Sequence, residues 1–314
     1  MKNLPLEKSF SKKYRKKWKS FRLFLYVLPG ILFIILFKYA PLWGWSYAFF
    51  QYKPGKDLFD CTFVGWDNFT TLFENVVMRN NLFRVLKNTF GIHLLGYVFS
   101  PLPMIFAITL CEMKSKRFQK LTQTLTTLPH FVSWVIMFSL TFTLFSKNGF
   151  INNQLMEHGI IEKSINILTT DKHVWLTQVL LQQWKGLGWG AIVYFAAIAG
   201  IDPQLYEAAM VDGAGRFRRI WHITVPHLIP TYFVLMVIGI GNFLNTGVDQ
   251  YIAFGNALNK ETIEVLDLYV YNLGIGSGQI SFSVAVGIMK SVVALILFSS
   301  SNIVSKKIRG ESIF

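Results

Sequence analysis

Polar residues recur at helical spacing within an apolar stretch near residue 245. Four of them fall at positions i, i+3, i+4 and i+7: Asn242, Asn245, Thr246 and Asp249. A continuous helix would place all four on one face. Amides and carboxylates bind sugar hydroxyls, and aromatic rings stack on the apolar faces of sugars. Phe243, Gln250 and Tyr251 lie beside the stripe. We call these seven the path residues, because they predict part of a sugar path; the alternative is that they join helices or subunits.

The chain around these residues has the composition of an integral membrane protein. Hydrophobic residues make up 52% of 314 and charged residues only 15%. A soluble protein of this size would have too little polar surface to cover its core. The formal net charge of +14 is a feature of many nucleic-acid-binding proteins. In so apolar a chain it indicates cytoplasmic loops and contact with lipid head groups, so no nucleic acid is expected.

Six apolar runs are long enough to cross about 30 Å of hydrocarbon. They are residues 23–43, 88–110, 126–146, 178–200, 231–250 and 283–304. The predicted fold is therefore an all-α polytopic membrane protein with six transmembrane helices. Residues 1–22 form a basic segment, residues 23–304 the transmembrane domain, and residues 305–314 a tail. The basic segment is either a helix on the membrane surface or a disordered tail that only fixes topology.

The distribution of charge fixes the expected orientation. With the N-terminus inside, the inner segments 1–22, 111–125, 201–230 and 305–314 hold 19 Lys and Arg against 6 acids. The outer segments 38–87, 147–173 and 250–282 hold 10 of each. Positive charge favours the cytoplasmic side, so we expect both termini in the cytoplasm. Cys61 and Cys111 then lie on opposite faces, and no disulfide is expected.

Residues 202–230 form a polar break between two apolar runs. Asp202 supplies a side-chain acceptor at an N-cap, and Pro203 fits the first helical position. Gly213 permits the left-handed conformation that ends a helix. The sequence predicts a helix of about ten residues, ~15 Å long, which is too short to cross a bilayer.

A second helical turn is expected from Arg216 to His222. Arg216, Arg218 and Arg219 would face solvent or lipid head groups; Phe217, Ile220 and Trp221 would form the apolar side. Pro226 and Pro230 are expected to stop this turn before the fifth span. Residues 202–230 as a whole are either a docking surface for another protein or a plain connection between two spans.

The sequence of this loop resembles that of a known family. The pattern E-A-A, three residues, G, nine residues, I-x-L-P is the cytoplasmic signature of permease subunits of binding-protein-dependent ABC importers. It is matched by Glu207, Ala208, Ala209, Gly213, Ile223 and Pro226, with Val225 in place of Leu. Asp212-Gly213-Ala214 and Ile223 to Pro226 are similar to the carbohydrate branch. FLNTGVDQYIAFGN, VLDLYVYNLGI and SKKIRGESIF resemble its complex-oligosaccharide and polysaccharide subgroup.

The resemblance implies a mechanism and a set of partners. In such importers the loop helix sits in a cleft of a cytoplasmic ATPase, and closure of two ATPases around ATP moves two permease subunits from inward- to outward-facing. Glu207 would be the polar anchor in that cleft, and Gly213 would orient the helix. The six matched residues are called the coupling residues below. The expected partners are a second homologous permease, two ATPase subunits, an external solute-binding protein, membrane lipid and an oligosaccharide substrate.

The chain has no sequence motif for chemistry of its own. No G-x-x-x-x-G-K-[ST] occurs, so ATP and Mg²⁺ are expected on the partner ATPase and no cofactor or metal on this chain. No nucleophile, base or ligand set is clustered, so an enzyme is not expected. Two alternatives stay open: an ABC permease for a solute other than a sugar, and an ion-coupled secondary transporter that uses Asp249.

Overall fold

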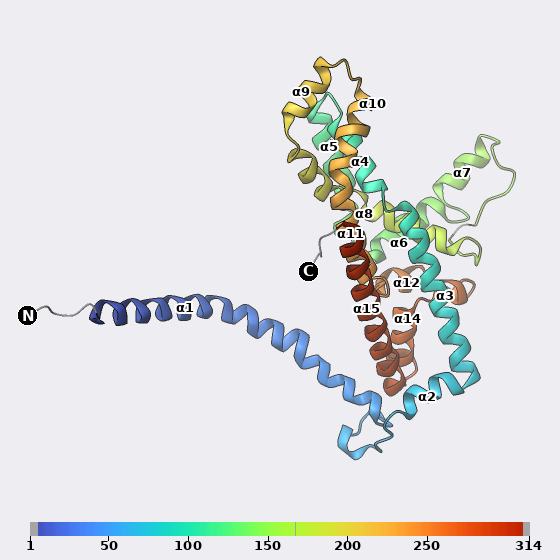
Figure 1. Cartoon of the computed structure of the whole chain (residues 1–314). Coiled ribbons are helices and arrows are strands. Elements are labelled where there is room, and N and C mark those ends of the chain that lie inside the picture. Colours follow the sequence, from blue (N-terminus) through green and yellow to red (C-terminus); the bar gives the residue numbers. More distant parts are fainter. Residues whose placement is uncertain (1–5, 167, 310–314) are drawn as a thin grey trace, which may run out of the picture.

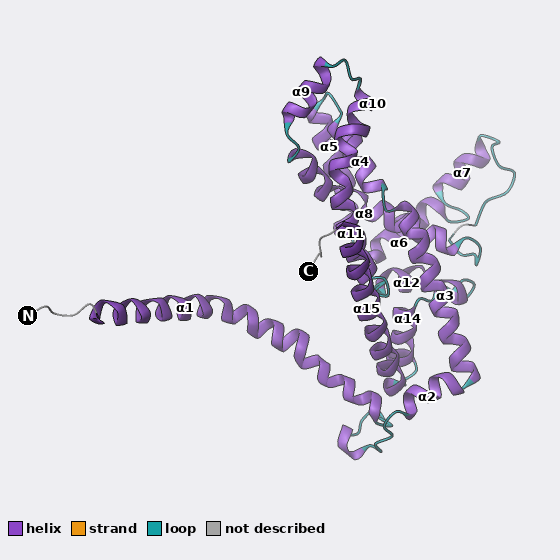
Figure 2. Ribbon diagram, viewed as in Figure 1, coloured by secondary structure: helices purple, strands orange, loops and turns teal. Residues whose placement is uncertain are grey.

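Helices are the regular elements of the structure. The computed structural model describes residues 6–166 and 168–309, which Figure 2 shows as helices and loops. Within them the only strand-like pairing is an isolated bridge between Phe50 and Phe63. The α-helices are α1 Leu6–Ile34, α2 Asp67–Glu74, α3 Val76–Phe99, α4 Leu102–Cys111, α5 Lys116–Phe131, α6 Trp134–Phe145, α7 Phe150–Glu157, α8 Val174–Ala199, α9 Pro203–Val211, α10 Arg216–Arg219, α11 Val225–Gly241, α12 Asp249–Phe254, α13 Lys260–Ile263, α14 Leu266–Tyr271 and α15 Ile280–Arg309. Short 3-10 or π segments are η1 Ile35–Tyr39, η2 Ala40–Phe49, η3 Leu58–Asp60, η4 Ile220–Thr224 and η5 Asn272–Gly276.

Five helical segments of the described chain are long and apolar enough to cross a membrane. They are Phe21–Phe49, Val76–Cys111, Trp134–Glu157, Arg216–Gly241 and Ile280–Ile303. A sixth results if α8 and α9, which are bent by 69° at the break between them, are counted as one span. The prediction of an all-α polytopic membrane protein is confirmed.

Three apolar clusters join the helices into one bundle, apart from α1. One gathers α3, α14 and α15 with η2, a second joins α3 and α8 to α12–α14, and a third joins α4, α8 and α11. No residue of α1 is among those that the described part of the chain contributes to these clusters, whereas η2, at the end of the first span, belongs to the first one. In Figure 1, α1 leaves the bundle entirely, and its most apolar window has no buried residue. Lipid or another subunit must therefore cover this span.

Segments predicted on the same side of the membrane contact each other. Arg216 donates to the Glu112 carboxylate over 2.7 Å, which joins the predicted inner segments 111–125 and 201–230. On the predicted outer side, the Tyr52 amide donates to Ser281 Oγ over 3.0 Å. Figure 1 places α9 and α10 at one end of the bundle and α2 near the other. The contacts agree with the predicted grouping of the loops.

Two predicted spans differ from the helices in the structure. The second begins at Val76 rather than at residue 88, and its helix breaks after Phe99, where Pro101 and Pro103 follow. The third, predicted at 126–146, is not one helix. Its chain is extended at Val132 and Ser133, and the Ser133 hydroxyl accepts from the Ile136 amide to start α6.

The prolines after α10 do not stop the helix, contrary to the prediction. Pro226 lies in the first turn of α11 and Pro230 inside it. Immediately before Pro226, the π segment η4 shifts the backbone pairing, so that the Val225 amide donates to the Ile220 carbonyl. This wider turn accommodates a proline ring that a regular turn would push against a carbonyl. Helical structure therefore continues from Arg216 to Gly241.

The prediction of a fifth span at 231–250 is wrong, because these residues do not form one helix, and this changes the arrangement of the path residues. Helix α11 ends at Gly241, residues 242–248 are not helical, and α12 begins separately at Asp249. The four polar residues therefore do not form a stripe on one helix. Two features explain the break: Gly247 has a φ of +74°, and the Thr246 and Gly247 amides donate to Asp267 Oδ2 instead of to helix carbonyls.

Candidate functional site: coupling helix and solute path

The ends of α9 are fixed by local residues, as the sequence predicted. Asp202 Oδ1 accepts from the Gln204 amide over 2.9 Å, and Pro203 occupies the first turn. At the other end, Gly213 has a φ of +74° and its amide donates to the Met210 carbonyl. The Ala214 amide donates to the Ala209 carbonyl, which completes a Schellman motif. Both ends of α9 are therefore capped by residues of the same short segment.

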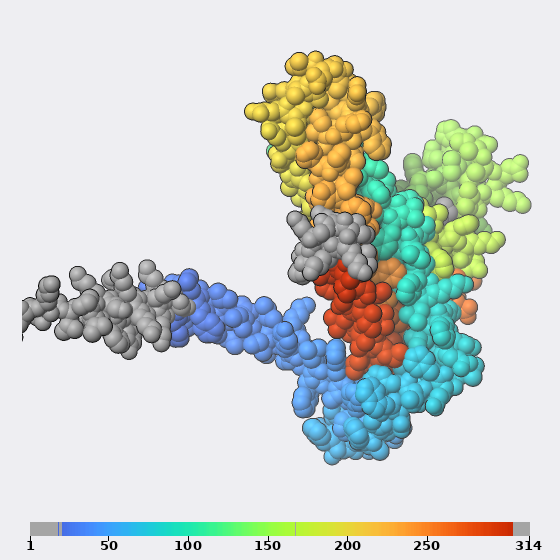
Figure 3. All heavy atoms as spheres, in the orientation of Figure 1, coloured from blue at the N-terminus to red at the C-terminus, as the bar shows by residue number. Residues whose placement is uncertain are grey.

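Helix α9 buries none of its nine residues in this chain. Glu207 and Ala208 are exposed and Ala209 is half-buried. Apolar side chains on the helix are exposed too, notably Val211 at 88% and Met210 at 52%. Figure 3 shows this region as a protrusion at one end of the molecule. An exposed apolar surface on a capped helix is typical of a site that another protein covers.

A few side-chain contacts join α9 to the rest of the chain. The Tyr206 hydroxyl lies 2.9 Å from the Thr224 hydroxyl on η4. The contact between Arg216 and Glu112 links the following turn to the loop after α4. The other two coupling residues lie further along this route, with Ile223 half-buried on η4 and Pro226 exposed at the start of α11. These contacts connect α9 and the turn after it to η4 and to the loop after α4.

The path residues separate into two groups. Asn242, Asn245 and Asp249 are exposed and Thr246 is half-buried. Phe243, Gln250 and Tyr251 are buried. Phe243 packs among aromatic rings, with Tyr97 stacked at 6.0 Å, and Gln250 donates to Gln178 Oε1 over 2.8 Å. The buried group packs helices together, so only the exposed group and Thr246 border open space.

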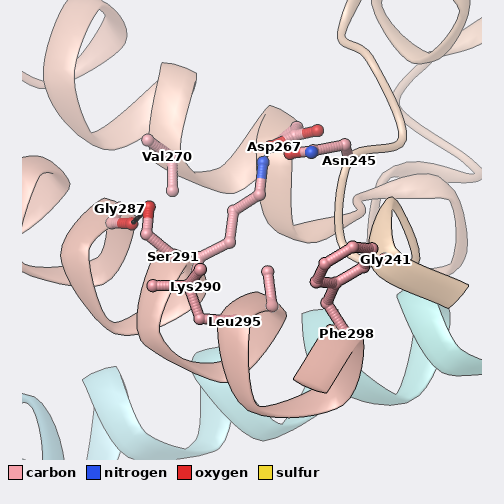
Figure 4. A pocket seen from close by; sticks show the side chains of 10 residues that line it. Gly241, Asn245, Asp267, Val270, Gly287, Lys290, Ser291, Leu295 and Phe298 are labelled. Carbon is pink, nitrogen blue, oxygen red and sulfur yellow. Dashed lines mark hydrogen bonds and ion pairs between the residues drawn. The ribbon is translucent and has the colours of Figure 1, made fainter. Parts of the chain in front are cut away.

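A cavity of about 470 Å³ lies beside the break at residues 242–248. Figure 4 shows Asn245 at one side of it and Lys290, from α15, extending toward Asp267 of α14. These two charged residues form an ion pair, and each side chain is about 15% exposed. Asp267 Oδ2 also accepts from the Thr246 amide over 2.9 Å. Asp267 thus joins the non-helical segment to α14 and α15.

Sequence reasoning missed Asp267 and Lys290. A signal for them existed, since Lys290 is a charge inside the sixth apolar run and intramembrane charges are rarely without a function or a partner. It also missed a polar stripe on α8. Gln178, Gln182, Lys185 and Trp189 follow at i, i+4, i+7 and i+11. Gln182 donates to the Tyr251 hydroxyl over 3.3 Å, so the first part of this stripe faces α12. Lys185 and Trp189 instead contact His130 of α5.

Comparison with known proteins agrees with this geometry. Residues 99–310 match the family model described as binding-protein-dependent transport system inner membrane component. The chain is 40% identical over 304 residues to Protein LplB of Bacillus subtilis, which covers 96% of this chain and 92% of that protein. It is also 40% identical over 293 residues to the polygalacturonan/rhamnogalacturonan transport system permease protein YteP of the same organism, covering 93% and 90%.

Solved structures agree with the sequence relatives. A bacterial ABC transporter involved in the import of the acidic polysaccharide alginate contains a chain with a TM-score of 0.82 and 33% sequence identity, covering 95% of this chain and 99% of that one. A second structure shows that transporter in complex with an alginate pentasaccharide-bound periplasmic protein. Similarity extends over nearly the full length in both sequence and fold. The chain belongs to the family of binding-protein-dependent transport system inner membrane components.

Proposed function

We propose that this chain is a membrane-spanning subunit of an ATP-driven importer that moves an oligosaccharide across the cytoplasmic membrane of a bacterium. Both termini lie in the cytoplasm in this proposal. The observation that carries it is α9, a helix with both ends capped that buries no residue in its own chain. Such a helix in a transport family is suited to seat in the cleft of a second protein.

The partner of α9 is a cytoplasmic ATPase. The chain has no phosphate-binding loop motif, so ATP and Mg²⁺ bind on that partner and this subunit is not an enzyme. Glu207 is exposed next to apolar residues of α9 and anchors it in the ATPase cleft. Gly213 sets the direction in which the chain leaves the helix. The contacts of Arg216 and Tyr206 carry the movement of the ATPase into the bundle.

The complete transporter is a heteromer. None of the residues in the most apolar part of the first span, Phe21–Phe49, is buried. This leaves a large surface for lipid and a second permease subunit. Two permeases with two ATPases form the translocation pore, and an external binding protein delivers the substrate. The similar alginate transporter, whose structure includes a sugar-loaded periplasmic protein, supports the binding protein in this composition.

The solute is an oligosaccharide. YteP belongs to a polygalacturonan/rhamnogalacturonan transport system, and the alginate transporter imports an acidic polysaccharide; both are similar to this chain over most of its length. The exposed path residues Asn242 and Asn245 offer amides to sugar hydroxyls, and Asn245 lines the cavity beside the break. An ion-coupled transporter would use a buried carboxylate. Asp249 is exposed at the start of α12, so the geometry does not favour that alternative.

The test is a reversal of charge on α9. Glu207→Lys in the purified complex should lower the amount of ATPase that co-purifies with the permease and reduce ATP hydrolysis at least about tenfold, because the anchor is reversed. Glu162→Lys, the same change on an exposed residue of the predicted outer segment 147–173, is the matched control and should change neither. Wild-type ATPase binding and hydrolysis in Glu207→Lys would refute the role of α9.

A further inference from the structure

Lys185 places a positive charge within the predicted fourth span, residues 178–200. It is the twelfth of the 26 residues of α8. That position is about 16 Å along the helix axis, roughly half the thickness of the hydrocarbon core. An ammonium group at this depth is costly unless it faces a water-filled cavity, a ligand or a carboxylate.

No carboxylate neutralises Lys185 within the described chain. The ion pairs found there are Arg84 with Glu264, Arg216 with Glu112 and Lys290 with Asp267. The ammonium of Lys185 instead donates to the His130 carbonyl over 2.6 Å and lies 5.3 Å from the centre of the Trp134 ring. An ammonium has three N–H donors, so this one hydrogen bond leaves two available. Lys290, by contrast, already has its counter-charge.

The surroundings of Lys185 fit a sugar ring. Trp189 follows four residues later, on the same face of α8, and is 47% exposed. Its ring stacks on His130 with centroids 4.4 Å apart, in planes inclined by 1°. Gln182 lies one turn before Lys185 and adds an amide. The break between α5 and α6 at Val132 and Ser133 lies beside these groups, where no helix continues across. An aromatic face, an amide and a cation together suit a sugar that bears a negative charge.

We propose that Lys185 is a specificity-determining residue that binds the carboxylate of a uronic acid unit as the substrate crosses the membrane. This inference rests on the proposed function and narrows its substrate to acidic oligosaccharides. The bond is a charge-assisted hydrogen bond between the ammonium and one carboxylate oxygen, and no covalent step is involved. The likeness to importers of alginate and polygalacturonan agrees with this chemistry.

A competing role for Lys185 is purely structural. Its bond to the His130 carbonyl closes the C-terminal end of α5, where a cation is favourable. Two variants separate the roles. Lys185→Gln keeps an N–H donor for His130 but removes the charge, whereas Lys185→Arg keeps the charge. If Lys185 acts only through its hydrogen bond to His130, Gln behaves like the wild type, and if the end of α5 needs a cation, Gln lowers the thermal stability. Carboxylate binding predicts that Gln lowers import of the acidic probe at unchanged stability and that only Arg retains it.

The experiment uses proteoliposomes that contain the complete transporter and saturating binding protein. The probes are two acidic trisaccharides, from polygalacturonan and alginate, and two neutral ones, maltotriose and xylotriose. Wild type should import at least one acidic probe in preference to both neutral ones. Lys185→Gln should lower the rate for the acidic probe about 10- to 100-fold, while Lys185→Arg should stay within about threefold and the thermal stability of both variants should match the wild type.

Three results would decide against the proposal. Import of the acidic probe at the wild-type rate by Lys185→Gln overturns it. Import of neutral probes alone by the wild type overturns the acidic substrate class and leaves the oligosaccharide importer intact. If the wild type shows no ATP-dependent import of any of the four probes, the inference and the proposed function are overturned together.

Discussion

The two ends of the bundle are held together in different ways. At the predicted outer end, the Glu264 carboxylate is only 6% exposed and accepts from Arg84 over 2.6 Å and from Asn272 over 2.8 Å. At the coupling end, α9 buries none of its residues, and the neighbouring ion pair between Arg216 and Glu112 is more exposed. Exposed pairs contribute up to about 1 kcal/mol, whereas loss of one partner from a buried pair costs several kcal/mol.

This difference separates what the chain stabilises alone from what a partner must complete. The outer end fixes the break at residues 242–248, where a solute would need defined positions. The coupling end presents a pre-formed helix whose orientation is held by two side-chain contacts. An importer driven by a separate ATPase requires both features: fixed side-chain positions at the predicted outer end, and an exposed α9 that a partner can bind at the coupling end.

The largest effect is expected where two helices touch through their backbones. A Cβ added at Gly188 of α8 would lie 2.4 Å from the Thr126 carbonyl of α5, and backbone atoms cannot rotate away. Gly188→Ala should therefore destabilise the permease by about 3 kcal/mol and leave little folded protein in the membrane. Gly186→Ala, where a Cβ meets nothing within 4 Å, is the control. Thermal unfolding in detergent measures both, and equal stability of the two variants would contradict the packing.

A second prediction compares one ion pair from each end. Glu264→Gln removes the charge from a carboxylate that is 6% exposed and should cost roughly 2–4 kcal/mol, because Arg84 is left without its counter-charge. Glu112→Gln breaks the exposed pair with Arg216 and should cost less than about 1 kcal/mol. Unfolding midpoints of the two variants give the comparison directly. If Glu112→Gln were the more damaging change, the contrast between the two ends would be wrong.

Asp267 allows a third test, in which transport is affected more than stability. Asp267→Asn keeps an oxygen to accept from the Thr246 and Gly247 amides but loses the charge that faces Lys290. We expect slower sugar import, by about tenfold, from an unpaired Lys290 beside the cavity. Adding Lys290→Met removes that charge and should restore part of the rate. A double variant slower than the single one would show that the pair does not act as a unit.

Local signals predicted α9 and failed at the break in the fifth span. An N-cap Asp, a first-turn Pro and a C-terminal Gly act within a few residues, so Asp202, Pro203 and Gly213 could be interpreted without tertiary information. The end of α11 depends on Asp267, which lies some twenty residues beyond the amides it accepts from. A spacing rule assumes a continuous helix and cannot detect a distant acceptor.

The same limit explains the other differences. The helix continues through Pro226 because η4 precedes it, and a π segment has no clear sequence signature. The pairing of Arg84 with Glu264, and of Lys290 with Asp267, depends on how distant helices pack. Composition and charge were sufficient to predict a polytopic membrane protein, since hydrophobic length and the distribution of Lys and Arg are properties of the whole chain.

Only a small change in stability is expected at the turn that ends α9. Gly213 has a φ of +74° but open space around it, so Gly213→Ala meets no clash and should cost only about 1 kcal/mol of backbone strain. Relief of that strain would alter the Schellman motif and turn α9 relative to Arg216. ATP hydrolysis stimulated by the loaded binding protein should therefore fall severalfold while the unfolding temperature barely moves. Gly215→Ser is the matched control, because φ of −66° and ψ of 169° suit serine at an N-cap. Equal hydrolysis in the two variants would mean that the direction of this turn does not matter for coupling, whereas a loss confined to Gly213→Ala separates coupling from folding within three residues.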